Sequence, residues 1–502
     1  MAYKRRLLLW LTVCVGVLVL ILIASSFLLP VLFDPNSIKN RVSGDIEQNT
    51  GIKIEFRDAA VSMLPYPRVI LHKGSIIQPS RVSGEIRSLI VYLRVMPLLT
   101  GRIERKKLEI DAPHVSIDIT RLTEPHDPQA EKARSLPGLQ EVIAVMMNCI
   151  KEARLIGNIS VDNGTVSLVD EGSEVFRFDQ IDGSILVKDS IFEGNLVCGS
   201  NLWKTLNVNL RLDLDKLTGK SQFIFAQFHP QLLTGYLFPS APQQLGESEL
   251  NLTVGVVSKS NKALEIDFKS SIPCLTIQQE PENLKVRARA AEGQVNISPN
   301  AVSVKLSKLD FDFPKLNATA GFLWDPDENN AIIELRGNDV DATALRRVAL
   351  ALLSRYRGVR NTFRVVRGGD VSAITVKAQG TSLADLRKLK SYTIEGDMVN
   401  GIIYIPKIQL EVQKASGHAV ISQTVLEAKD LKGTTVGNSV ATDGRLKLGL
   451  KRGKGGSAPF ELDINLDADL AYLPPVLDLA VKDQAFLREL ALIKKEMERR
   501  AL

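Results

Sequence analysis

The segment Leu206-Asn-Val-Asn-Leu-Arg-Leu-Asp-Leu214 places an apolar residue at every second position. Successive side chains of a β-strand point to opposite faces of the sheet, so this segment predicts a strand with one apolar and one polar face. Residues 250–256 and 462–470 repeat the pattern. Further segments of period two, about twenty in all, predict a mainly β fold with an elongated, curved sheet and a few helices at its ends and interruptions, and the apolar face of this sheet is a candidate groove.

The apolar side chains of these three segments are the candidate lining of the groove. The candidates are Leu206, Val208, Leu210, Leu212, Leu250, Leu252, Val254, Leu462, Ile464 and Leu466. Alternation alone fits two arrangements. In an open groove these side chains are available to an apolar ligand, whereas in a closed sandwich they pack against one another.

A degenerate repeat relates three predicted hairpins. Their second strands begin at Phe176, Val304 and Leu426, which are 128 and 122 positions apart. In each second strand the apolar alternation slips by one residue after two apolar positions, as a β-bulge would cause.

Apolar residues at helical spacing predict the helices. One lies near residues 38–46, one at 139–153, one at 341–357 with Asp341 as its N-cap, a shorter one from Ser382 through Leu389, and one from about Val481. The predicted parts of the chain are residues 1–33, a stub and membrane anchor; 34–120, a β module with a membrane-exit helix; 121–157, a linker and amphipathic helix; 158–340, a β-rich groove; 341–480, a helix with a β-rich groove; and 481–502, an amphipathic helix.

Residues 7–33 form an uncharged stretch of 27 residues preceded by Lys4, Arg5 and Arg6. A helix of this length exceeds the ~30 Å hydrocarbon core of a bilayer. The positive cluster predicts a cytoplasmic N-terminus, with residue 34 onward on the other side of the membrane. A cleaved signal peptide is the alternative, but its apolar region usually spans only about 7–15 residues.

Charge and motifs argue against several classes of function. The net charge of +6 comes from 63 basic and 57 acidic residues that are interspersed, whereas nucleic-acid binding needs clustered basic charge. The five histidines show no metal-ligand spacing, and no Gly-x-Ser-x-Gly, phosphate-binding loop or Cys-x-x-Cys motif occurs. Cys149, Cys198 and Cys274 allow one disulfide at most outside the predicted anchor. We therefore expect no enzyme activity, no cofactor and no metal.

An ordered set of short motifs in the first 120 residues resembles the AsmA family. The motifs that follow the apolar anchor are Asp34-Pro-Asn36, Gln48-Asn-Thr-Gly-Ile-Lys-Ile54, Ser62-Met-Leu-Pro-Tyr-Pro67, Pro97-Leu-Leu-Thr-Gly-Arg-Ile103 and Leu108-Glu-Ile-Asp-Ala-Pro-His-Val115. The resemblance implies a bacterial protein held in the inner membrane by residues 7–33, with a periplasmic β-groove similar to those of bridge-like lipid transfer proteins.

From this resemblance we expect a protein that shelters the acyl chains of phospholipid or another acylated lipid. It also implies a role in lipid transport and outer-membrane assembly, including regulation of protein targeting to the membrane. The alternative is a scaffold that transports nothing and holds envelope protein partners.

Overall fold

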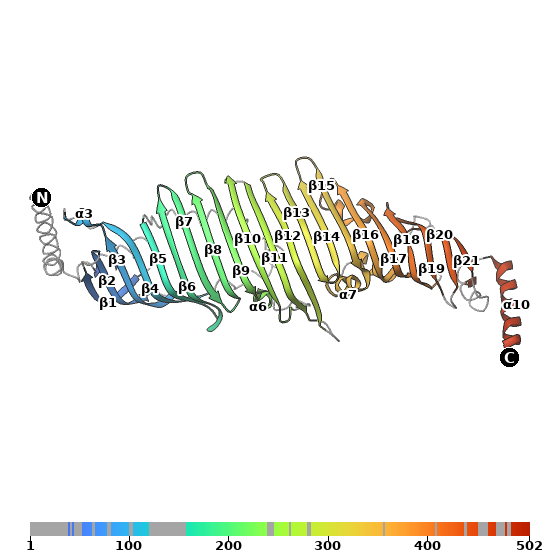
Figure 1. Cartoon of the computed structure of the whole chain (residues 1–502), viewed down its shortest axis with the longest axis horizontal. Coiled ribbons are helices and arrows are strands. Elements are labelled where there is room, and N and C mark those ends of the chain that lie inside the picture. The colour runs from blue at the N-terminus through green and yellow to red at the C-terminus, as the bar shows by residue number, and fades with distance from the viewer. Residues whose placement is uncertain are drawn as a thin grey trace, which may run out of the picture. The chain divides into compact units, whose positions relative to one another are not determined.

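The computed structural model describes residues 39–40, 43–44, 53–62, 66–77, 82–99, 104–119, 157–237, 245–260, 263–278, 283–354, 357–406, 409–435, 439–449, 460–467, 477–478 and 483–501. Twenty-one strands dominate these residues, which confirms the predicted mainly β class. The chain divides into two compact units, residues 1–228 with 255–262 and residues 229–254 with 263–502. Figure 1 labels the elements of both units.

The first unit is an open sheet whose strands pair in the order of the sequence. Its strands are β1 (Lys53–Ser62), β2 (Arg68–Ile77), β3 (Val82–Leu93), β4 (Arg105–Asp118), β5 (Gly157–Asp170), β6 (Ser173–Lys188), β7 (Ile191–Ser200), β8 (Trp203–Asp213) and β9 (Thr218–Phe228). A short helix, α3 (Val95–Leu99), separates β3 from β4. All neighbours are antiparallel except β4 and β5, which are parallel and therefore need the long connection that residues 119–156 provide.

The second unit contains an antiparallel sheet that also follows the order of the chain. Its strands are β11 (Ala263–Ile277), β12 (Leu284–Ile297), β13 (Val302–Phe313), β14 (Leu316–Asp325), β15 (Asn330–Asp341), β16 (Val366–Gly380), β17 (Tyr392–Ile405), β18 (Leu410–Ser422), β19 (Val425–Thr434), β20 (Val440–Gly449) and β21 (Phe460–Asp467). Strand β10 (Glu249–Ser260) begins in this unit, and its last residues are grouped with the first. The helices are α6 (Pro230–Leu237), α7 (Ala342–Leu353), α8 (Arg357–Val365) and α10 (Gln484–Ala501).

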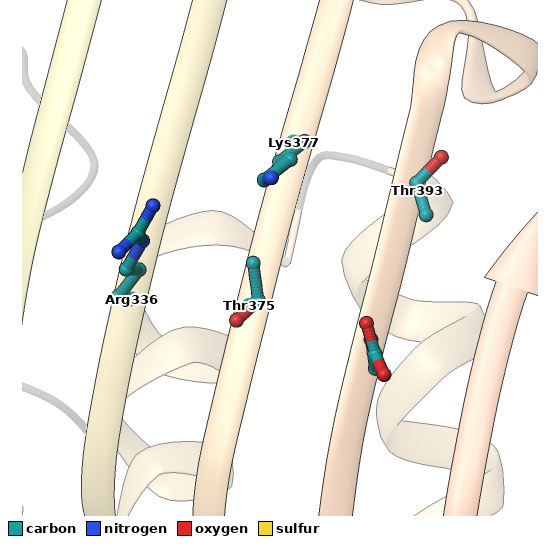
Figure 2. Close-up of a pocket in the computed structure, with 5 residues that line it drawn as sticks. Arg336, Thr375, Lys377 and Thr393 are labelled. Carbon is teal, nitrogen blue, oxygen red and sulfur yellow. The ribbon is translucent and has the colours of Figure 1, made fainter.

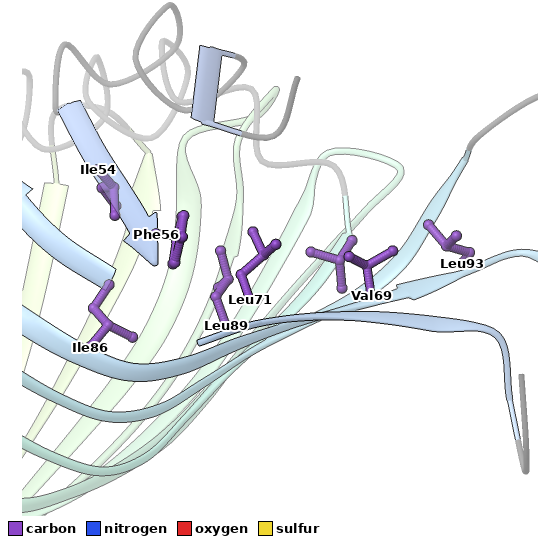
Figure 3. Packing of buried hydrophobic residues seen from close by; sticks show 8 residues of the cluster. Ile54, Phe56, Val69, Leu71, Ile86, Leu89 and Leu93 are labelled. Carbon is purple, nitrogen blue, oxygen red and sulfur yellow. The ribbon is translucent and has the colours of Figure 1, made fainter. Parts of the chain in front are cut away.

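Left-handed residues interrupt the alternation of neighbouring strands in the first unit. They are Lys73, Ala112, Asn163 and Gln180, with φ between 43° and 52°. Their effect is visible in β2, where Leu71 and Ile76 belong to one apolar cluster. Unbroken alternation would have placed these two positions on opposite faces. Figure 3 shows other members of the cluster, including Phe56 and Leu89, on the same side of the curved strands.

The one-residue slip predicted in three hairpins is confirmed by the strand registers. The registers shift between Asp179 and Asp182 in β6, between Leu306 and Leu309 in β13, and between Ala428 and Leu431 in β19. In each case the strand advances by three residues while its partner advances by two. Because a bulge bends its strand, these positions curve the sheet while keeping apolar side chains on one face.

The predicted helices meet different outcomes. Asp341 caps α7 as expected, since its carboxylate accepts the backbone N–H of Thr343 and of Ala344 at 2.9 Å. The C-terminal helix is also present, as α10. The helix predicted from Ser382 is wrong, because residues 385–391 form two 3₁₀ turns, η2 (Asp385–Arg387) and η3 (Leu389–Ser391). Its apolar spacing is helical, but the Asp385 side chain bonds its neighbours locally and so favours turns.

Two predicted helical segments, residues 7–33 and 139–153, lie outside the described residues. Among the residues that are described, no helix is both long and apolar enough to cross a membrane.

Candidate functional site

The sheet of the first unit carries an unbroken apolar row that crosses all nine strands. Residues paired across neighbouring strands point to the same face, so a row can be followed from pair to pair. One row is Ala59, Leu71, Leu89, Ile110, Val161, Gly183, Leu196, Val208 and Phe223. A parallel row runs from Val61 through Val91, Ile185 and Leu210 and ends at Ser221.

The second unit has the same feature over eleven strands. Its row is Phe268, Gly293, Leu306, Ala320, Leu335, Val376, Ile394, Ile421, Leu426, Leu448 and Phe460. Every member is apolar or glycine. At ~4.8 Å between strands, each unit therefore offers roughly 40–50 Å of continuous apolar surface.

The opposite face of the second unit is polar. Arg336, Thr375 and Glu395 are paired in succession across β15–β17, one position away from the apolar row. They line a shallow hollow with Lys377 and Thr393, and Figure 2 shows side chains on this face with helices behind the strands. Ionic contacts such as Arg336–Glu334 at 2.7 Å lie along this face, and the Arg336 hydrogen bond lowers the pKa of Glu334.

The apolar face at β8 and β9 is only partly covered, which distinguishes it from a sandwich core. Leu206 and Val208 retain 8% and 7% of their exposure because strand neighbours flank them. Leu210, Leu212 and Phe223 on the same face stay half-buried. Side chains enclosed between two sheets would be almost fully buried. At β8 and β9 the burial pattern is that of an open sheet face, whereas at β2 and β3 the side chains of Val69, Leu71, Leu89 and Val91 retain 2% or less of their exposure.

The sequence-predicted lining residues fall into three groups. Leu206, Val208 and Leu210 form one cluster with Phe223 and Phe225 of β9, and Leu212 extends the same strand. Leu250, Leu252 and Val254 lie half-buried in β10. In β21, Leu462 pairs with Leu446 and Leu466 pairs with Ala441, while Ile464 is half-buried and Leu466 is 42% exposed. The groups therefore lie on β8, β10 and β21.

Sequence reasoning missed an aromatic cluster at one end of β8. The Trp203 ring lies 5.6 Å from Phe178, 5.4 Å from Phe225 and 6.3 Å from Phe228, measured between centroids. Gln227 has a φ of 50°, so the alternation that would reveal this cluster is broken. The cluster adds a broad apolar surface beside Leu206.

The described residues also include two thiols and one histidine that contacts two carboxylates. No group of three or more potential metal ligands occurs among them. Cys198 is buried and Cys274 is half-buried, both as free thiols, and burial raises the pKa of Cys198. His418 contacts Asp397 at 2.8 Å and Glu395 at 3.4 Å.

Comparison with known proteins adds one result. Neither the curated proteins nor the solved structures include a significant match to this chain. Residues 3–196, which include β1–β6 and most of β7, match the model of the AsmA family. By that match, residues 3–196 of the chain are similar to the AsmA family.

Proposed function

We propose that the open apolar faces shelter the acyl chains of phospholipid or another acylated lipid, without catalysing a reaction on it. The observation that carries this proposal is the row of paired apolar residues from Ala59 to Phe223, which no charged side chain interrupts. A sheet face that meets only water usually carries polar residues in such a row. The row from Ala59 to Phe223 contains none, which fits a surface that holds hydrocarbon.

The free energy of moving acyl chains from a membrane into water indicates how much shelter a lipid needs. Moving one CH₂ group from a membrane into water costs about 0.8 kcal/mol. A lipid with about thirty such groups therefore needs roughly 25 kcal/mol of shelter to cross an aqueous space. An apolar surface of roughly 40 Å is longer than the ~15 Å depth of one bilayer leaflet, so it can cover whole acyl chains.

The cellular location that we propose rests on the similarity of residues 3–196 to the AsmA family. We place the chain in a bacterial inner membrane through residues 7–33, with the β units in the periplasm. There it would support lipid transport and outer-membrane assembly, including regulation of protein targeting to the membrane, and it would meet envelope proteins as partners. A scaffold that carries no lipid is the outcome against which the experiment is designed.

Photo-crosslinking in cells that express the full chain tests the proposal. A photoreactive residue at Leu210 or Ile394 faces the apolar side, whereas the same residue at Asn209 or Glu395 faces the polar side. We expect phospholipid adducts at the first two positions and background levels at the matched controls. Equal adducts on both faces, or protein adducts alone at Leu210 and Ile394, would reject lipid sheltering and favour the scaffold.

A further inference from the structure

The helical insertion between β15 and β16 is unusually basic. Residues 342–369 contain seven arginines, no lysine and no acidic residue. This segment carries +7 in a chain whose net charge is +6, so the rest of the chain has a net charge of −1. We call α7 and α8 together the arginine hairpin. Such an excess of arginine over lysine favours recognition of phosphate, because the planar guanidinium matches phosphate oxygens with paired hydrogen bonds.

The arginine hairpin packs on an apolar surface at one end of the strands. Val348 and Ala351 of α7 belong to a cluster with Ile277 of β11 and Leu284 and Val286 of β12. Arg346 Nε donates to the Phe363 carbonyl at 3.1 Å, which joins α7 to α8. Figure 1 shows α7 beside the ends of β14–β16. Positive charge is therefore held next to apolar side chains, which is the arrangement that an amphiphile requires.

Several of these arginines are not neutralised by the contacts that they make. Arg360 Nη1 donates to the Ser354 carbonyl, and Arg346 also bonds a carbonyl, so both contacts leave the positive charge in place. Arg364 is exposed on α8. Arg367 differs, because it pairs with Glu411 at 2.6 Å and lies 3.9 Å from the Tyr404 ring. The exposed arginines of α8 that could meet a headgroup are therefore Arg360 and Arg364.

Two leucines extend the apolar surface at the end of α7. Leu352 is 38% exposed and Leu353 is 42% exposed, immediately before the arginines of α8. Arg360 donates to the carbonyl of Ser354, the residue that follows Leu353, so a positive charge and an exposed apolar side chain lie close together here.

We propose that the arginine hairpin binds the phosphate headgroup of an anionic lipid whose acyl chains lie on the apolar face of the second unit. This inference rests on the proposed function and deepens it by assigning headgroup charge as the selected property. Charge complementarity identifies the occupant: a lipid with net negative charge satisfies several guanidinium groups, whereas a zwitterionic headgroup brings its own cation into the cluster.

The test uses the full chain in cells, with a photoreactive residue at Leu353 and adduct masses read by mass spectrometry. Adducts with the wild-type arginines are expected to be enriched in anionic over zwitterionic phospholipid at least 3-fold relative to the surrounding membrane. Arg360→Gln combined with Arg364→Gln should return this ratio to that of the membrane. The conservative pair Arg360→Lys and Arg364→Lys should retain most of the enrichment, because it keeps the charge.

The control is Lys305→Gln combined with Lys308→Gln, which removes two charges from exposed positions of β13 in the same unit. This pair should leave the ratio unchanged. The headgroup site is overturned if Arg360→Gln with Arg364→Gln keeps the full enrichment, or if the β13 control loses as much of it. In either case, lipid adducts at Ile394 would still support lipid sheltering. If neither Leu353 nor Ile394 yields lipid adducts, lipid sheltering fails and the headgroup site fails with it. Capture of water-soluble phosphate compounds in place of lipid also overturns it.

Discussion

Gly369 of β16 lies so close to Gly401 of β17 that a Cβ added to Gly369 would stand 2.4 Å from the Gly401 Cα. Gly369 also has a φ of +117°, which side chains rarely adopt. We expect Gly369→Ala to lower the free energy of unfolding by about 2 kcal/mol, through backbone strain and displacement of β17. Urea unfolding of the full chain measures the change.

The matched control is Gly321→Ala in β14. A Cβ there would have no neighbour within 4 Å, so we expect a change below about 1 kcal/mol. Equal losses in the two variants would show that the contact between β16 and β17 is not the cause.

The core of the first unit provides a second prediction. Leu71 is 0% exposed and packs in the cluster of Figure 3, so Leu71→Ala should cost about 2–5 kcal/mol of unfolding free energy. Leu186→Ala removes the same atoms from a side chain that is 40% exposed and should cost less than about 1 kcal/mol. Urea unfolding monitored by tryptophan fluorescence distinguishes them, and a Leu71→Ala chain as stable as Leu186→Ala would refute the packing.

Asp385 gives a prediction about pH. Its carboxylate accepts hydrogen bonds from Lys388 Nζ at 2.6 Å, Thr381 Oγ1 at 2.8 Å and Ser382 Oγ at 3.1 Å, and these lower its pKa. A lowered pKa in the folded state stabilises the fold above the unfolded value of about 3.9, and this contribution declines as the pH falls towards the folded value.

Hydrogen exchange of residues 381–391 reports this contribution. Asp385→Asn should accelerate exchange several-fold at pH 6 relative to the wild type, and the ratio of the two rates should decrease steadily as the pH falls below about 4. If the ratio does not change with pH, the charge of Asp385 is not the cause of the faster exchange.

Local pattern was enough to predict some elements and not others. Alternation at Leu206–Leu214 identifies β8 and its apolar face, because one strand determines which way its own side chains point. The turns near Asp385 were mistaken for a helix, since hydrogen bonds among neighbouring side chains override apolar spacing. Local pattern does not predict the arginine hairpin as a site, because α7 packs on Ile277 and Leu284, which lie more than 50 positions before it in the sequence.

The two described cysteines should differ in reactivity. Cys198 retains 4% of its exposure and burial raises its pKa, so little thiolate is available, whereas Cys274 is only half-buried. In a chain with Cys14 and Cys149 replaced by serine, iodoacetamide should alkylate Cys274 at least several-fold faster at pH 8. Unfolding in urea should equalise the two rates. Faster alkylation of Cys198 in the folded chain would contradict its burial between β6 and β8.

A charge introduced at Leu210 distinguishes an open apolar face from an enclosed one. A carboxylate buried without a partner costs several kcal/mol, which is comparable with the ~5–15 kcal/mol stability of a whole domain. Because Leu210 is half-buried, Leu210→Glu can keep its carboxylate hydrated, and we expect the chain to remain folded. The same carboxylate interrupts the apolar row and should reduce lipid adducts at a photoreactive residue in position Leu196 at least several-fold.

Asn209→Glu is the matched control, because Asn209 precedes Leu210 in β8 and faces the opposite side, where it pairs with Asn195. It introduces the same charge and should leave the adducts at Leu196 unchanged. Circular dichroism and protease resistance establish whether each variant is folded. Loss of the folded chain in Leu210→Glu alone would indicate an enclosed core, whereas a folded Leu210→Glu chain with undiminished adducts would show that lipid does not lie along this row.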